Sequence, residues 1–256
     1  MFISKKIAIS GGDIFRDDYS VAFGGTDEYI DTGATFQSTF RGDHSISVWV
    51  KPTDGQPSST SILSGYKNSS EQDIMYLAIL STGKVRYYFE ANNDDDLIDS
   101  GSAVFADGQN DWTHLVITSE KSAVKGFKLY VNGVLNTEAN SNAVSDSNWG
   151  QFTTDLNLYI GGYNNQGTNG LHYTGGMSDF AIYNKVLSAS EAFSIYNNRQ
   201  PFNHNDSSFK GNLVTWYRMG DGLESGGGST MYDMAGSNNG TLTNIDTGDI
   251  QGDVPK

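Results

Sequence analysis

The acidic side chains that are candidates for glycosidic bond cleavage lack the spacing that this chemistry requires. Retaining glycoside hydrolysis uses two carboxyl groups about 5 Å apart, a separation that alternate positions on one β-strand provide. Glu71-Gln72-Asp73 lacks the second glutamate, and Asp94-Asp95-Asp96 is expected to form a solvated, charged turn. The sequence therefore predicts no glycosidase activity.

Other catalytic constellations are equally missing from the sequence. No Gly-x-Ser-x-Gly elbow follows a strand-like run, and no glycine-rich phosphate motif joins a strand to a helix. The chain has no cysteine, and its four histidines show no zinc spacing. They are His44, His114, His172 and His204. We therefore expect a protein that is not an enzyme.

Aromatic and amide side chains in polar segments are the candidates for glycan binding. Sugar C–H faces stack on aromatic rings, while hydroxyl groups need fixed hydrogen-bonding partners. Tyr163-Asn164-Asn165, Trp149 and Tyr66 lie in or beside long polar segments and combine these two properties. The alternative role for each aromatic residue is to anchor its loop.

The elements that must position these residues are short β-strands. Runs rich in Val, Ile, Tyr, Phe and Trp alternate with Asn, Asp, Gly and Ser clusters, which is typical of an all-β protein. Asn132-Gly133 predicts a type I′ hairpin turn, and Thr82-Gly83 predicts a second turn. Ser188 and Glu191 form a capping box that predicts one short helix. The predicted strands or hairpins cover residues 45–50, 79–89, 112–118, 127–135, 156–160 and 177–183.

Long polar loops are expected to join these strands. Loops of this length at the surface of a domain are often functional. The predicted loops cover residues 54–61, 66–73, 91–108, 138–151 and 163–170.

Six segments in order resemble the laminin G-like jelly-roll family of the concanavalin A-like superfamily. The resemblance covers residues 20–197 and implies an all-β sandwich of two antiparallel sheets. The segments are SVAFGGTDEYIDTG (20–33), HSISVWVKP (44–52), DWTHLVIT (111–118), KLYVNGVL (128–135), LYIGGY (158–163) and YTGGMSDFAIYNKVLSASEAFSIY (173–196). The family's paired-glutamate hydrolase motif, Glu-x-Asp-x-x-Glu, does not occur in this sequence.

The C-terminal part resembles the strands that normally open such a domain. These segments are GNLVTWYRMGDG (211–222) and MYDMAGSNNGTLTN (231–244), and both follow the predicted helix. We therefore predict a circularly permuted domain with an arm at 1–19, a core at 20–200 and an extension at 201–256 that supplies the opening strands. Two alternatives stay open: the extension is a truncated second repeat, or it completes the sheet of a neighbouring subunit.

The resemblance also implies a calcium site. Members of the superfamily often hold Ca²⁺ between a carboxylate of the closing strand and carbonyl groups near the opening strands. Asp179 matches the first position, and Asp221 together with carbonyls near Gly24 would complete the site in a permuted domain. The alternative is that Asp179 caps a turn by hydrogen bonding.

Charge and targeting signals limit the partners and the location. The formal net charge of −14 disfavours nucleic acid and anionic membranes. The apolar run Ile7-Ala8-Ile9 is too short for a signal peptide. A lectin-like domain without an export signal or catalytic residues suggests a virion structural protein of a tailed bacteriophage, a capsid decoration or tail-associated protein that contacts other virion proteins or copies of itself.

Two further functions were weighed against the virion role. The alternative is a carbohydrate-binding or adhesion module of a bacterial surface protein, which would act outside the cell. A divergent glycan-active enzyme is the least favoured possibility.

Overall fold

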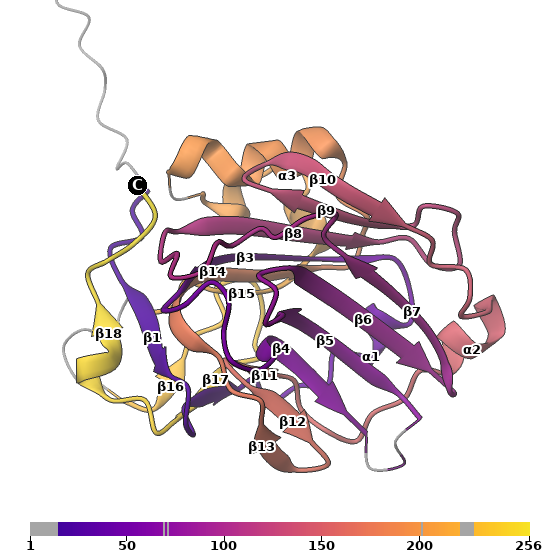
Figure 1. Cartoon of the computed structure of the whole chain (residues 1–256), viewed down its shortest axis with the longest axis horizontal. Coiled ribbons are helices and arrows are strands. Elements are labelled where there is room, and N and C mark those ends of the chain that lie inside the picture. The colour runs from indigo at the N-terminus through magenta and orange to yellow at the C-terminus, as the bar shows by residue number, and fades with distance from the viewer. Residues whose placement is uncertain (1–14, 69, 71, 201, 221–227) are drawn as a thin grey trace, which may run out of the picture.

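Two antiparallel β-sheets face each other and form a sandwich in the computed structural model (Figure 1). The structure describes residues 15–68, 70, 72–200, 202–220 and 228–256. The all-β two-sheet fold predicted from the sequence is therefore confirmed. Among the described residues, no helix has the length and apolar character that crossing a membrane requires.

The first sheet has eight strands in the described part of the chain. Its strands, in spatial order, are β10 (Val134–Ala139), β9 (Phe127–Val131), β8 (Thr113–Ser119), β3 (His44–Pro52), β14 (Thr174–Tyr183), β1 (Ser20–Gly24) and β18 (Ile250–Gln251), with β15 (Leu213–Tyr217) beside β14.

The second sheet has ten strands over the same described residues. Its strands, in spatial order, are β16 (Thr230–Met231), β17 (Gly240–Thr243), β2 (Tyr29–Asp31), β11 (Tyr159–Ile160), β4 (Ser61–Lys67), β5 (Ile74–Ile79), β6 (Val85–Ala91) and β7 (Asp94–Asp99), with the hairpin β12 (Tyr163–Asn165) and β13 (Thr168–Gly170) beside β4.

Alternating apolar residues from both sheets fill the space between them. In the eight-stranded sheet Ile46 and Val48 are fully buried, and in the ten-stranded sheet Leu77 and Phe89 meet them in one apolar cluster. Because side chains alternate between the two faces of a strand, the remaining positions point away from this core. Those outward positions of the ten-stranded sheet form the candidate site described below.

The outer face of the eight-stranded sheet is also covered. Helix α3 (Ala189–Tyr196) lies over it (Figure 1), and Tyr196 stacks on Trp49 with ring centroids 5.6 Å apart. A second apolar cluster there includes Tyr183, Ile195 and Trp216. Both faces of β3 are therefore buried.

Local signals in the sequence locate the turns and this helix correctly. Asn132 and Gly133 have φ values of 49° and 76°, as the predicted turn between β9 and β10 requires. The capping box at Ser188 and Glu191 is formed at the start of α3. The predictions of this hairpin and of this helix are confirmed.

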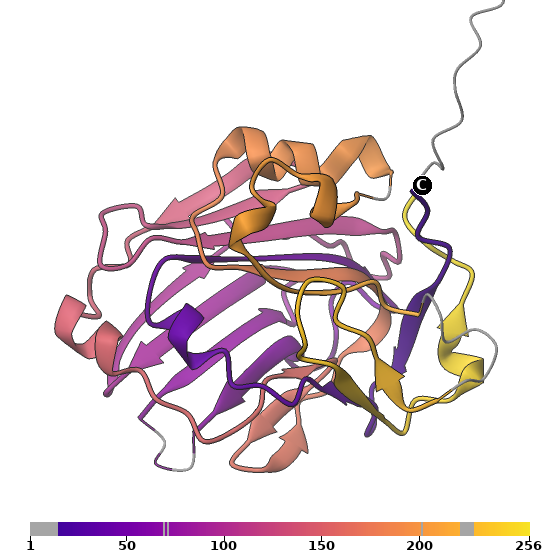
Figure 2. The same ribbon diagram turned by 180° about the vertical axis from the view of Figure 1, so that it is seen from behind.

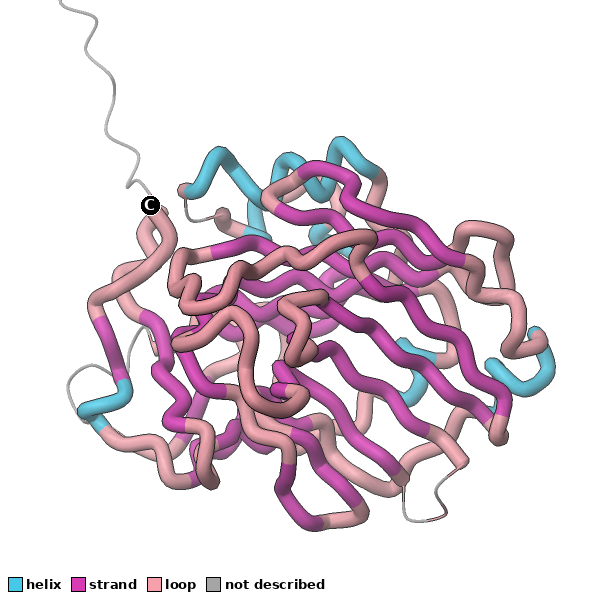
Figure 3. Tube along the Cα trace, viewed as in Figure 1, coloured by secondary structure: helices cyan, strands magenta, loops and turns pink. Residues whose placement is uncertain are grey.

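The predicted loops contain more regular structure than expected. Segment 91–108 includes strand β7, so Asp94-Asp95-Asp96 lies in an edge strand and not in a solvated turn. Asp96 is buried and accepts a hydrogen bond from the Val144 backbone N–H at 2.9 Å. Segment 138–151 includes helix α2 (Asp146–Gln151), and a further short helix, α1 (Gln37–Phe40), precedes β3. Figure 3 shows that the helices lie at the periphery of the sheets.

C-terminal strands join both sheets of their own chain. β15 pairs with β14, β18 pairs with β1, and β17 pairs with β2, all antiparallel. Figure 2 shows the C-terminal strands, in gold and yellow, beside the N-terminal strands, in indigo. The division of the chain at residues 19 and 200, and its origin by permutation, stay predictions.

Candidate functional site

Three tyrosines form a row across the outer face of the ten-stranded sheet. Tyr76 on β5 and Tyr88 on β6 are opposite each other in the strand register, and their rings stack with centroids 5.1 Å apart and planes 12° apart. Tyr163 on β12 meets Tyr76 edge to face at 6.0 Å. Since Tyr76 and Tyr88 alternate with core residues along their strands, their rings face away from the core. We call Tyr76, Tyr88 and Tyr163 the tyrosine row.

Gly65 lies within the tyrosine row, between Tyr76 and Tyr163, and Leu97 lies beside one end of it. Gly65 on β4 lies opposite Tyr76, and a Cβ atom at this position would come within 2.6 Å of the Tyr76 Cβ. A side chain at position 65 would therefore displace Tyr76. Leu97 on β7 lies opposite Tyr88, at the Tyr88 end of the row, and is 37% exposed. The tyrosine row and Leu97 therefore lie side by side on the outer face of the sheet.

Polar groups flank the row on the same strands. The Arg86 guanidinium donates two hydrogen bonds to the Asp99 carboxylate, at 2.6 and 2.8 Å. Tyr88 Oη donates to Glu90 Oε2 at 3.0 Å. The hydrogen bond to Asp99 raises the pKa of Arg86, and burial raises the pKa of Glu90. Ring faces beside fixed donors and acceptors are the combination that sugar binding requires.

A second aromatic pair lies further along the same sheet. Tyr29 on β2 and Tyr159 on β11 stack with centroids 4.3 Å apart and planes 24° apart. Their neighbours Ile30 and Ile160 point into the core, which puts both tyrosines on the outer side. The outer side of this sheet therefore carries aromatic rings on several strands, of which Tyr159 is only 8% exposed.

The predicted glycan-binding residues separate into two groups. Tyr163 belongs to the tyrosine row, next to Asn164 and the exposed Asn165, but its own side chain is only 8% exposed. Asn164 is buried: its Nδ2 donates to the Asn157 carbonyl at 2.8 Å, and its Oδ1 accepts from the Gly167 N–H at 3.0 Å. Asn164 therefore holds the β12–β13 turn in shape.

Trp149 and Tyr66, by contrast, are core residues. Both are fully buried. Trp149 Nε1 donates to the Phe40 carbonyl at 2.9 Å, and Tyr66 Oη donates to the Thr35 carbonyl at 3.1 Å. Neither ring presents a face to solvent. Both residues therefore anchor their segments in the core, which is the alternative role predicted for each aromatic residue.

The surroundings of Asp179 do not fit a calcium ion. Asp179 is 3% exposed, and its two oxygens accept hydrogen bonds from Trp216 Nε1 at 2.5 Å and from His204 Nε2 at 3.1 Å. Calcium binds oxygen ligands, whereas these neighbours present N–H groups. Among the described residues no group of three or more acidic or histidine side chains could hold a metal ion. Asp221 lies outside the described residues, so the predicted pair stays a prediction.

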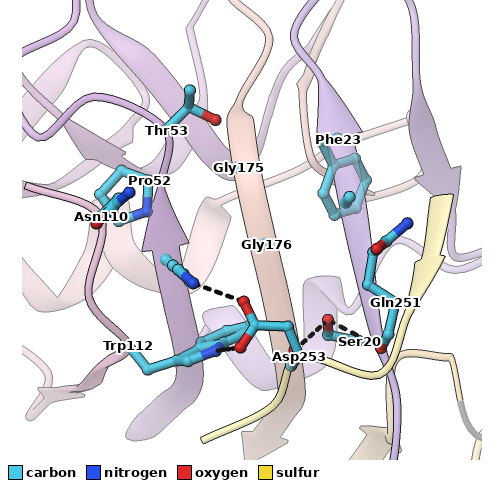
Figure 4. A pocket seen from close by; sticks show the side chains of 12 residues that line it. Ser20, Phe23, Pro52, Thr53, Asn110, Trp112, Gly175, Gly176, Gln251 and Asp253 are labelled. Carbon is cyan, nitrogen blue, oxygen red and sulfur yellow. Dashed lines mark hydrogen bonds and ion pairs between the residues drawn. The ribbon is translucent and has the colours of Figure 1, made fainter.

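A hollow of about 250 Å³ on the eight-stranded sheet is held together by its own polar groups (Figure 4). The Asp253 carboxylate accepts from Lys51 Nζ at 2.6 Å and from Trp112 Nε1 at 3.2 Å, and its backbone carbonyl accepts from Ser20 Oγ at 2.7 Å. We call Ser20, Lys51, Trp112 and Asp253 the C-terminal clasp. Since these groups already pair with one another, the clasp fixes the end of the chain and is a weaker candidate for ligand binding than the tyrosine row.

Sequence reasoning missed Tyr76, Tyr88 and Arg86, although a signal for them was present. The observed hairpin pairs Ile79 with Val85, and Leu80 N–H donates to the Lys84 carbonyl, so residues 81–83 form a three-residue loop and Tyr76 lies opposite Tyr88. Residues on one face of a strand recur at every second position. Alternation along the predicted hairpin therefore places Arg86 and Tyr88 on one face, but a two-residue turn at Thr82-Gly83 would have put Phe89 and not Tyr88 opposite Tyr76.

Comparisons with known proteins agree with this fold. A family model described as the concanavalin A-like lectin/glucanases superfamily matches residues 23–192. The CBM40 module of the Ruminococcus gnavus IT-sialidase, solved with α2,3-sialyllactose, matches with 19% identity and a TM-score of 0.54 over 71% of this chain and 100% of that one. No curated protein matches the sequence.

Two other solved structures are similar. A candidate carbohydrate-binding protein from Bacteroides ovatus shares 18% identity with a TM-score of 0.61, over 90% of this chain and 59% of that one. A heptameric SAP-like pentraxin from Limulus polyphemus shares 14% identity with a TM-score of 0.52, over 72% and 83% of the two chains. At such identities the likeness shows the fold alone.

Proposed function

The chain belongs to the concanavalin A-like lectin/glucanase superfamily, and on this basis we propose that it is a non-catalytic carbohydrate-binding module that binds glycans on the tyrosine row. The observation that carries the proposal is the stacked Tyr76–Tyr88 pair on the outward face of the sheet, next to Arg86 and Glu90. The similar structures include a CBM40 module solved with sialyllactose and a candidate carbohydrate-binding protein, and this supports the proposal.

Glycan binding has better support than the virion role expected from the sequence. The virion role is an expectation from the sequence alone, and the similar structures give it no support. The proposed carbohydrate-binding role corresponds to the alternative considered with it, a module of a bacterial surface protein. A location outside the cell is part of this proposal.

The proposal is tested by removing one ring of the row. We expect Tyr76→Ala to weaken glycan binding by about tenfold or more, because truncating a central aromatic anchor typically costs over 1 kcal/mol. The measurement is a glycan array followed by isothermal titration calorimetry with each oligosaccharide that binds. Phe193→Ala is the matched control, since Phe193 is 57% exposed on α3, over the other sheet.

The Phe193→Ala variant should bind glycan as the unchanged protein does. Two outcomes would contradict the proposal. Equal affinity of the Tyr76→Ala variant and the unchanged protein would show that the tyrosine row is not the site. Binding of no glycan by the unchanged protein would contradict the proposed function itself.

A further inference from the structure

The cations beside the tyrosine row are already engaged by carboxylates. Arg86 and Asp99 form a bidentate pair in which each side chain is less than one-third exposed, at 29% and 28%. Bidentate guanidinium–carboxylate pairs are strong and fixed in geometry. An anionic ligand would have to break this pair before it could use the Arg86 charge.

Lys67, the second cation on these strands, also has a carboxylate nearby. Lys67 on β4 is in the same cross-strand line as Ile74 and Glu90. Attraction between Lys67 and Glu90 lowers the pKa of Glu90, in opposition to the rise that burial causes. The positive charge of Lys67 is thus partly balanced by an acidic neighbour on the same face.

Carboxylates outnumber cations around the row. Glu90 on β6 and Asp95 and Asp99 on β7 are at outward positions of these two strands, against the cations Arg86 and Lys67. The whole chain carries a formal net charge of −14, which repels anionic ligands over longer distances as well. Hydroxyl groups, in contrast, can donate to carboxylates and accept from tyrosine without a charge penalty.

We infer that the tyrosine row accepts neutral, hydroxyl-rich glycans and rejects sialylated or sulfated ones, an inference that rests on the proposed function. This selectivity differs from that of the similar CBM40 module, which was solved with sialyllactose. The difference follows from the side chains on this face, since a shared fold does not fix the ligand.

The experiment compares neutral oligosaccharides with counterparts that differ only in an added sialic acid or sulfate. Titrations use the full chain. We expect the neutral member of each pair to bind about tenfold more tightly or better, which corresponds to 1.4 kcal/mol. Equal or tighter binding of the acidic members would overturn this inference and leave glycan binding intact. Binding of neither member would remove the proposed function and this inference together.

Two variants test the physical cause. Asp99→Asn removes the partner of Arg86, and we expect the preference for neutral glycans to fall by about fivefold, the upper range for a partly exposed ion pair. Glu138→Gln is the matched control, because it releases Lys125 from an ion pair at the edge of the other sheet. A change in preference no larger than that of Glu138→Gln would show that the pairing of Arg86 does not set the selectivity.

Discussion

Asp179 holds a buried hydrogen-bonding cluster together. Its carboxylate is 3% exposed and accepts from Trp216 and His204. Asp179→Ala removes both acceptors and leaves two buried N–H groups unpaired, so we expect the free energy of unfolding to fall by about 2–4 kcal/mol. Asp179→Asn keeps one acceptor oxygen and suits the positive φ of 54°, so its loss should be smaller. Urea denaturation measures both, and equal losses would contradict this role of the carboxylate.

His44 links stability to pH. Burial lowers the pKa of His44 from 6.5 to about 4, while its Nε2 contacts Tyr87 Oη at 2.6 Å. Between these two pKa values the unfolded chain binds a proton that the folded chain does not, so the free energy of unfolding falls as pH drops from about 6.5 to about 4. We expect a flatter pH dependence in this window for His44→Gln. The measurement is denaturant unfolding at a series of pH values.

A second buried histidine also contributes to the pH dependence of the free energy of unfolding. Burial also lowers the pKa of His114, to about 3, so part of the slope should remain in the variant. A slope in His44→Gln identical to that of the unchanged protein would show that His44 is not protonated on unfolding in this range. Comparing slopes, and not midpoints, separates this effect from any loss of packing.

Burial decides which aromatic residues predicted from the sequence are available. Tyr163, Trp149 and Tyr66 occur in similar polar surroundings along the chain, yet Trp149 and Tyr66 are fully buried in the core, and Tyr163, which contacts Tyr76 on the outer face, is only 8% exposed. Local composition does not reveal this, because burial depends on which distant strand packs over a ring. Strand register depends on the exact length of the turn, and a two-residue turn at Thr82-Gly83 would have paired Tyr76 with Phe89, so the Tyr76–Tyr88 pair could not be located from the predicted turn alone.

The C-terminal clasp holds β18 and the residues after it against the eight-stranded sheet. Burial raises the pKa of Asp253, but hydrogen bonds from Lys51 and Trp112 outweigh burial, so its pKa is lowered overall. The clasp therefore stabilises the fold above the ordinary aspartate pKa, and this contribution is lost as pH falls through the lowered value. Asp253→Asn should speed amide exchange in β18 and β1 while changing global stability by under about 1 kcal/mol.

Hydrogen–deuterium exchange with mass spectrometry measures this local effect. Asp206→Asn is a suitable control, since Asp206 is exposed and hydrogen-bonds only its near neighbour Asn203 among the contacts described. Unchanged exchange in β18 of the Asp253→Asn variant would show that the clasp does not anchor this strand.

Strands with clear alternation were predictable, and short or edge elements were not. The hairpin of β9 and β10 and helix α3 each carry a local signal, a turn pair or a capping box. Strand β7 has the sequence DDDLID, whose acidic residues suggest a turn. It forms a strand because β6 offers a free edge for pairing. Helices α1 and α2 have four and six residues, too few to show a helical period.

The C-terminal segment completes both sheets and thereby determines how the molecule assembles. Trp216 and Tyr217 of β15 are buried, and β17 covers the edge of β2. Sequence resemblance identified these strands as opening strands but did not distinguish pairing within one chain from exchange between two chains. Pairing within one chain leaves no strand to be supplied by a partner, so folding should need only a single copy.

A folded single chain and a strand-exchanged dimer differ in how their stability depends on concentration. If β15, β17 and β18 pair within their own chain, the unfolding midpoint stays constant across about a hundredfold range of protein concentration, because no association step contributes to stability. An exchanged dimer would become more stable as concentration rises. Thermal unfolding combined with light scattering measures both properties on the same samples. A dimeric mass with a rising midpoint would show that the strands are exchanged, and the sheets would then each contain strands from two chains.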